Sequence, residues 1–129
     1  MTSLVPYLTV HDAAAAIAFY TAAFGAQENL QESERDETDG KIGFAALTIA
    51  GNPFYLSDEF HDYGAYAPAT LGHSSCAVVL GVDDADAVYA AAVAAGATVD
   101  REPSDQGDEK RGWLVDPFGH RWAIHSPLS

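Results

Sequence analysis

The chain contains two similar halves, and this internal repeat constrains its fold more than any other feature. The first half reads Val10-His11-Asp12, then an Ala-rich apolar stretch, then Phe24-Gly25-Ala26. The second half reads Val82-Asp83-Asp84, a second Ala-rich stretch, then Ala95-Gly96-Ala97, so the copies stay in register to within one residue. A repeat of this kind indicates two copies of one supersecondary unit that bury their apolar faces together. We therefore expect one compact domain with a pseudo-twofold axis.

Each half is expected to form one strand, one helix and three further strands. In the first half, apolar runs and turn residues predict a strand over 4–10, a helix over 13–24, a polar edge strand over 27–35, and strands over 42–49 and 53–57 joined at 50–52. In the second half they predict a strand over 75–82, a helix over 84–95, and strands over 98–101, 111–115 and 120–126. Asp12 is a suitable N-cap, and Gly25 suits a left-handed helix end. The predicted fold is α+β, with modules 1–57 and 74–129 joined by loop 58–73.

The charge balance excludes several classes of partner. The chain carries 19 Asp and Glu against six Lys and Arg, a net charge of −13. Nucleic acid and anionic membrane surfaces both need clustered positive charge, so neither is an expected partner. The acidity is compatible with attraction of a cationic ligand or simply with solubility. The start of the chain has no signal-peptide pattern and no apolar run could span a bilayer, so a cytoplasmic location is expected.

The single cysteine excludes an internal disulfide. Cys76 falls on the opposite strand face from Ala77, so we expect it to pack beneath the second helix as an inert thiol.

Four motifs, in the right order along the chain, resemble the glyoxalase/bleomycin-resistance family, also called the vicinal oxygen chelate superfamily. They are Ile17-Ala18-Phe19-Tyr20 followed by Phe24-Gly25-Ala26, Val82-Asp83-Asp84-Ala85-Asp86-Ala87 followed by Ala94-Ala95-Gly96-Ala97, Leu56-Ser57-Asp58-Glu59, and Asp116-Pro117-Phe118-Gly119-His120-Arg121-Trp122. The last two look most like an uncharacterised bacterial branch associated with phosphonate operons. The resemblance implies paired β-α-β-β-β modules that form a partly closed, cup-shaped sheet.

The resemblance also implies where a metal ion would bind. Enzymes of the family hold a divalent metal with His, Gln or Glu from four cavity-facing strand positions. By register these positions fall here at Val5, Tyr55, Ala77 and Ala123, and a hard divalent ion needs oxygen or imidazole donors that this set does not supply. The five histidines show no short metal-ligand spacing either. We therefore expect no metal and no other cofactor.

Strand alternation predicts which side chains would line a cavity, because residues two apart share a face. The expected lining is Tyr7, Thr9, Tyr55, Ser57, Ala77, Val79, Arg121, Ala123 and His125, with Trp113 as a further candidate. Arg121 would need an anionic partner, either a carboxylate of the chain or a ligand oxyanion. Loop 58–73 contains Phe60, Tyr63 and Tyr66, and is interpreted either as a lid over the cavity or as a linker whose rings dock elsewhere.

These patterns favour a metal-independent small-molecule-binding protein that acts as a homodimer and sequesters a drug or metabolite. The candidate ligand-binding residues are Tyr7, Thr9, Tyr55, Ser57, Phe60, Tyr63, Trp113, Arg121 and His125, and no catalytic residue is identified. One alternative is a lyase, isomerase or dioxygenase-type enzyme whose metal site is relocated or absent, using His125 or a tyrosine. A second alternative is an interaction module whose interior is filled by side chains.

Overall fold

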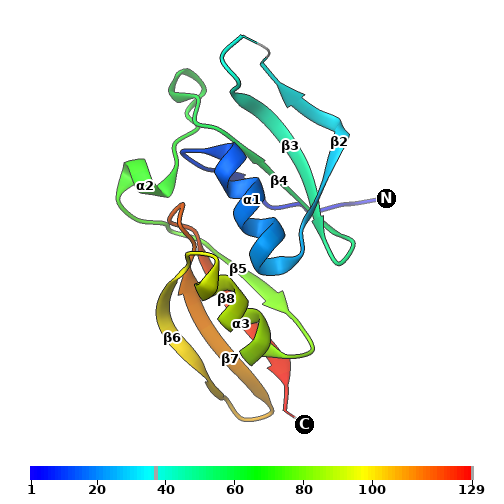
Figure 1. The fold of residues 1–129 in the computed structure, drawn as a ribbon, viewed down its shortest axis with the longest axis vertical. Coiled ribbons are helices and arrows are strands. Elements are labelled where there is room, and N and C mark those ends of the chain that lie inside the picture. The colour runs from blue at the N-terminus through cyan, green and yellow to red at the C-terminus, as the bar shows by residue number, and fades with distance from the viewer. Residues whose placement is uncertain (37, 129) are drawn as a thin grey trace.

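The computed structural model describes residues 1–36 and 38–128 and places two β-α-β-β-β modules in succession (Figure 1). The first module contains β1 (Tyr7–Thr9), α1 (Ala13–Phe24), β2 (Gln27–Arg35), β3 (Ile42–Ile49) and β4 (Asn52–Ser57). The second contains β5 (Ala77–Gly81), α3 (Ala85–Ala94), β6 (Thr98–Asp105), β7 (Glu109–Val115) and β8 (Arg121–Pro127). Between them lie the short 3₁₀-helix η1 (His61–Tyr63) and α2 (Pro68–Leu71). The predicted α+β class and the repeated order of elements are confirmed.

The two modules form two four-stranded mixed sheets with the same topology. The strand orders are β1-β4-β3-β2 and β5-β8-β7-β6, with the first pair of each sheet parallel and the others antiparallel. Helices α1 and α3 contact each other, and each covers one face of its own sheet (Figure 1). The main core lies between these helices and the sheets and includes Val10, Tyr20, Leu56, Leu114, Trp122 and Ile124. In the described part of the chain, neither α1 nor α3 packs on the opposite face of its sheet, and we call this the open face.

Local capping explains where the long helices begin. Asp12 has extended backbone and accepts a hydrogen bond from the Ala15 amide, and Asp84 does the same for Ala87. Each cap satisfies an amide that would otherwise lack a partner in the first helical turn. Helix α1 ends at Gly25, whose φ of 70° is the left-handed conformation that favours glycine. Both capping predictions for α1 are therefore confirmed.

A buried carboxylate connects the two modules. Asp116 is only 3% exposed and accepts hydrogen bonds from the Tyr20 hydroxyl and from the Trp122 indole, the latter at 2.9 Å. It also accepts from the backbone amides of Phe118 and His120, both at 2.9 Å. Burial, and then the adjacent Asp116 carboxylate, raise the pKa of Tyr20 well above its usual value, so this hydroxyl stays protonated and donates. One acid thus fixes both the turn before β8 and the position of α1.

The segment between the modules packs against the same turn. Pro68 is buried, and a Cβ atom added to Gly119 would lie 2.8 Å from the Pro68 Cβ atom. A second contact joins the turn to the first module, since the His120 Nε2 atom lies 2.8 Å from the Thr9 carbonyl oxygen. The end of loop 58–73 is therefore held on the second module.

We expect Gly119→Ala to lower the free energy of unfolding by about 2–4 kcal/mol, because it adds a clash to backbone strain. The φ of Gly119 is 90°, and the added methyl group would overlap Pro68. Gly107→Ala is the matched control, since its φ is 80° but nothing lies near its Cβ position. Urea denaturation of both variants measures the difference. Equal losses would mean that the contact with α2 is not tight.

Three local predictions were wrong. The β3–β4 hairpin turns at Ala50 and Gly51, which have φ values of 50° and 84°, and Asn52 is already the first residue of β4. The first strand is shorter than expected and β6 is longer, because pairing with neighbouring strands sets their ends. Cys76 is exposed, because it precedes β5 and strand alternation does not apply to it.

None of the helices in the described residues is long and apolar enough to cross a membrane.

Candidate functional site

The open face of the first sheet presents an aromatic cluster. Tyr7 and Tyr55 are neighbours across the parallel β1–β4 pair, and their ring centroids lie 5.9 Å apart. Phe44 on β3 completes the cluster, 4.8 Å from Tyr55 and 5.9 Å from Tyr7. Tyr7 is 52% exposed, and its hydroxyl donates to the Gly43 carbonyl at 3.3 Å. This face can contact a flat apolar group, and it supplies few charged groups.

The open face of the second sheet collects positive charge. On β8, Trp122 and Ile124 belong to the core, so Arg121, Ala123 and His125 face the other way. Cross-strand pairing places Trp113 beside Ala123 and Arg101 beside Trp113. Arg111 pairs with His125 in the same way. Three of the six Lys and Arg residues of this acidic chain therefore lie on one sheet face.

A carboxylate neutralises one end of this face. Glu109 forms an ion pair with Arg111, and its second oxygen lies 3.0 Å from Nδ1 of His125. This contact orients the imidazole ring, and it also keeps Glu109 occupied by two partners. Charge at this end of the face is therefore largely balanced within the chain.

Arg121 is different from the other basic residues. Its neighbours on the adjacent strands are Ala77 and Val115, both apolar, and its guanidinium carbon lies 5.0 Å from the centre of the Trp113 ring. Within residues 1–36 and 38–128, no carboxylate oxygen lies within 4 Å of its guanidinium nitrogens. The internal salt bridge that the sequence allowed for Arg121 is thus not found in the described part of the chain. Stacking on Trp113 instead holds a half-buried cation in place.

A pocket of about 360 Å³ opens next to Arg121. We call it the Arg121 pocket. One wall comes from the open face of the second sheet and the turn before β8, and the other from α2 and the residues that follow it. Its lining is Pro68, Ala69, Gly72, His73, Ser74, Val115, Gly119 and Arg121. No Asp or Glu of the described residues is among them.

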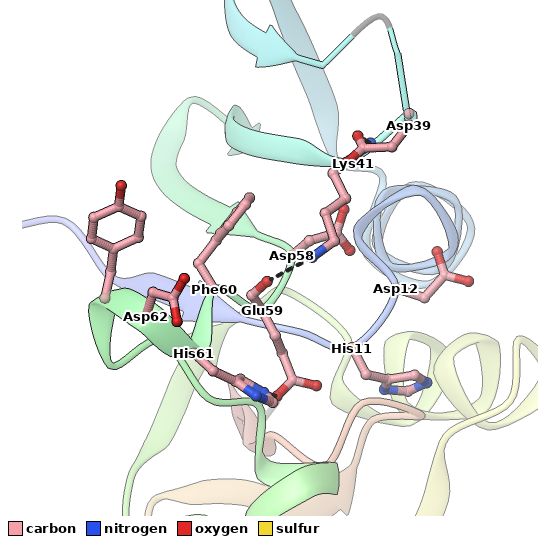
Figure 2. Close-up of a pocket in the computed structure, with 11 residues that line it drawn as sticks. His11, Asp12, Asp39, Lys41, Asp58, Glu59, Phe60, His61 and Asp62 are labelled. Atoms are coloured by element: carbon pink, nitrogen blue, oxygen red, sulfur yellow. Dashed lines mark hydrogen bonds and ion pairs between the residues drawn. The ribbon is translucent and has the colours of Figure 1, made fainter.

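A larger pocket, of about 610 Å³, lies elsewhere and is acidic (Figure 2). It is formed by the start of α1, the residues before β3 and the segment from Asp58 to Tyr63, and its lining includes Asp12, Asp39, Asp58, Glu59 and Asp62. We call it the acidic pocket. Several of these carboxylates already have backbone partners. Asp58 accepts from the amides of Ala13 and Ile42, both at 2.8 Å.

Glu59 is similarly engaged. It contacts His61 at 2.8 Å and accepts from the Thr70 hydroxyl at 2.7 Å and from the Ala67 amide at 3.2 Å. The His61 contact, followed by that from Thr70, lowers the pKa of the Glu59 carboxyl from its usual value. These contacts position the loop, so we interpret the acidic pocket mainly as a structural feature.

The structure places seven of the nine predicted ligand-binding residues in three different places and the other two outside them. Tyr7 and Tyr55 lie in the aromatic cluster of the first sheet, whereas Trp113, Arg121 and His125 lie together on the open face of the second. Phe60 and Tyr63 line the acidic pocket instead. Thr9 is half-buried beside His120, and Ser57 is buried and donates to the Asp58 carbonyl at 2.9 Å. A role in binding stays a prediction for all nine.

The aromatic residues Phe60, Tyr63 and Tyr66 of loop 58–73 are not among the residues that line the Arg121 pocket. Tyr63 is 88% exposed, and Tyr66 stacks on His61 with 4.4 Å between ring centroids. Tyr63 therefore neither covers a cavity mouth nor docks on another surface within the described chain. Sequence reasoning also missed the residues after the loop's rings, since His73 and Ser74 line the Arg121 pocket. Nothing in their local pattern indicated this position.

The side chains at the expected metal positions do not fit a metal ion. Tyr55 packs in the aromatic cluster, and Ala77 and Ala123 supply no donor atom. Among the described residues, no group of three or more His, Cys, Asp or Glu side chains is placed to hold a metal ion. We therefore derive no chemistry through a metal.

Comparison with known proteins gives one family. The family model described as Glyoxalase/Bleomycin resistance protein/Dioxygenase superfamily matches residues 3–124. An uncharacterised protein of Mycobacterium bovis is 39% identical over 131 residues, covering 98% of this chain and 84% of that protein. An uncharacterised Arabidopsis thaliana protein is 30% identical over 112 residues, covering 83% of this chain and 67% of that protein.

Solved structures share the fold at low sequence identity. Protein PA1353 from Pseudomonas aeruginosa has a TM-score of 0.77 at 20% identity, with all of both chains covered. TioX from Micromonospora sp. ML1 has a TM-score of 0.71 at 22% identity, covering 99% of this chain and 98% of that one. A Bacillus cereus protein described as PhnB and as a putative 3-demethylubiquinone-9 3-methyltransferase has a TM-score of 0.72 at 18% identity, covering 97% and 99%. These likenesses show the fold alone.

Proposed function

We propose that this chain, which belongs to the glyoxalase/bleomycin resistance protein/dioxygenase superfamily, is a metal-independent small-molecule-binding protein. In this proposal the ligand lies on the open face of the second sheet, against the Trp113 ring and beside Arg121. The protein acts as a homodimer in the cytoplasm and sequesters its ligand rather than converting it.

The observation that carries the proposal is the stacked pair of Trp113 and Arg121 on the sheet face that α3 does not cover. Ligand sites in proteins combine apolar and aromatic surface with a few fixed polar groups. Trp113 supplies the aromatic surface, and Arg121 supplies a fixed polar group stacked on it. Val79, which pairs with Ala123, is 63% exposed and extends the apolar surface.

Native mass spectrometry tests this proposal on protein purified without chelator. We expect an organic adduct that survives EDTA treatment, no stoichiometric metal, and the mass of a dimer. Trp113→Ala should lose the adduct, whereas Tyr63→Ala, which removes an exposed ring from the acidic pocket, should keep it. Stoichiometric Zn, Ni, Mn or Fe held by the native protein would overturn the metal-independent part. Retention of the adduct by Trp113→Ala would overturn the assignment to this face.

A further inference from the structure

Three pockets in the described part of the chain differ sharply in charge. Five carboxylate residues line the acidic pocket, and Asp86 and Glu102 line a third pocket of about 540 Å³ between α3 and β6. The Arg121 pocket has none, although 19 of the 129 residues are Asp or Glu. Its charged or chargeable groups are Arg121 and His73 alone. In a chain of net charge −13, an anion meets less repulsion in this pocket than in the other two.

We propose that the Arg121 pocket is an oxyanion subsite, which takes a carboxylate, sulfonate or phosphate group of the small molecule. This assignment rests on the proposed function and names the chemical class of the ligand. The guanidinium group of Arg121 forms paired hydrogen bonds to two oxygens of the anion. His73 and Ser74 lie on the opposite wall, where the Ser74 hydroxyl already donates to the Cys76 carbonyl at 3.0 Å.

The state of Arg121 supports this role better than that of any other basic residue. Arg35, Lys110 and Arg111 each form an ion pair with a carboxylate. The Lys41 ammonium lies 3.4 Å from the Glu59 carbonyl oxygen and 5.0 Å from the centre of the Phe60 ring. Arg101 is exposed, so solvent can satisfy its guanidinium without a protein partner.

Arg121 alone is a half-buried guanidinium with no carboxylate within ion-pairing distance in the described chain. Partial burial weakens its hydration, which makes an incoming anion a stronger partner than it would be at the surface. The nearest acid in sequence, Asp116, cannot serve, because its carboxylate is buried and accepts from Tyr20, Trp122 and two backbone amides.

The pocket is also built before any ligand arrives. Trp113 holds the guanidinium plane from one side, and the contact of Gly119 with Pro68 fixes the opposite wall on the turn before β8. Binding therefore immobilises few groups, and little affinity is lost to ordering.

Benzoate and benzamide are the probes, because they have the same shape and differ in charge. We follow binding by tryptophan fluorescence and by amide chemical shifts at constant ionic strength. For the native protein we expect benzoate to bind about tenfold or more tightly than benzamide, since a hydrogen bond to a charged group is lost in the amide. In Arg121→Gln the ratio of the affinities for benzoate and benzamide should fall to about 1, while the affinity for benzamide stays unchanged. The preference of Arg121→Lys for benzoate should be intermediate, because lysine keeps the positive charge but lacks the planar guanidinium that binds two oxygens at once.

Arg101→Gln is the matched control, since it removes the same charge from the same sheet face outside the pocket. It should keep the preference for benzoate. Equal binding of both probes by the native protein would overturn the oxyanion subsite and leave the proposed function standing. Inorganic phosphate tests the oxyanion subsite separately from the binding of an organic ligand. If it shifts the amides of His73, Ser74 and Gly119 saturably while no organic probe binds, the subsite stands and the proposed function fails. Anion binding that survives in Arg121→Gln, or no binding of benzoate or phosphate, would overturn the subsite.

Discussion

Replacing Asp116 with Ala is expected to lower the free energy of unfolding by about 3–5 kcal/mol, a large fraction of the total stability of a domain of this size. Four donors lose their acceptor at once, and the Tyr20 hydroxyl and Trp122 indole lie in the core. Each buried donor left without a partner costs about 1–3 kcal/mol, and the turn before β8 also loses two of its hydrogen bonds. Urea denaturation followed by circular dichroism measures the loss.

Two variants separate the carboxylate from a general effect of lost charge. Asp83→Ala removes the same charge from an exposed position in the second module and should change stability by no more than about 0.5 kcal/mol. Tyr20→Phe removes one of the four donors and should cost about 1 kcal/mol. If Asp116→Ala lowered the free energy of unfolding no more than Tyr20→Phe, the Asp116 carboxylate would not be what connects the two modules.

Most of the features that were predicted correctly from the sequence depend on local interactions. The caps at Asp12 and Gly25, the repeated helices and the polar edge strand β2 each depend on residues within a few positions, and each was predicted. The role of Asp116 was not, because its partner Tyr20 lies 96 positions away on the other module. A motif at 116–119 indicates a turn, but only the packing of α1 shows that this carboxylate is buried.

The candidate site shows the same division. Alternation along β8 placed Arg121 and His125 together on one face, and pairing with β7 brought Trp113 beside them. The sequence predicted one shared cavity lining, but Tyr7 and Tyr55 lie on the open face of the first sheet and Arg121 lies on that of the second. The relative position of the two sheets depends on how α1 packs against α3, which the sequence does not show. It also could not place His73 and Ser74 at the Arg121 pocket, because a loop without periodicity gives no orientation.

The acidic pocket provides a second stability prediction. Asp58→Ala is expected to lower the free energy of unfolding by about 2–3 kcal/mol, because one carboxylate accepts from the first amide of α1 and from the first amide of β3. Both are hydrogen bonds to a charged acceptor, which are stronger than neutral ones. The negative charge also lies at the helix N-terminus, where the helix dipole favours it. Thermal and urea denaturation measure the loss.

Asp62→Ala is the matched control, because Asp62 lines the same pocket and carries the same charge but is exposed. In a chain of net charge −13, removing a carboxylate that serves no backbone amide relieves repulsion. Asp62→Ala should therefore leave stability unchanged or raise it slightly, opposite in sign to Asp58→Ala. If both substitutions stabilised the protein, repulsion among the carboxylates would dominate the acidic pocket, and the interpretation that Asp58 ties α1 to β3 would be wrong.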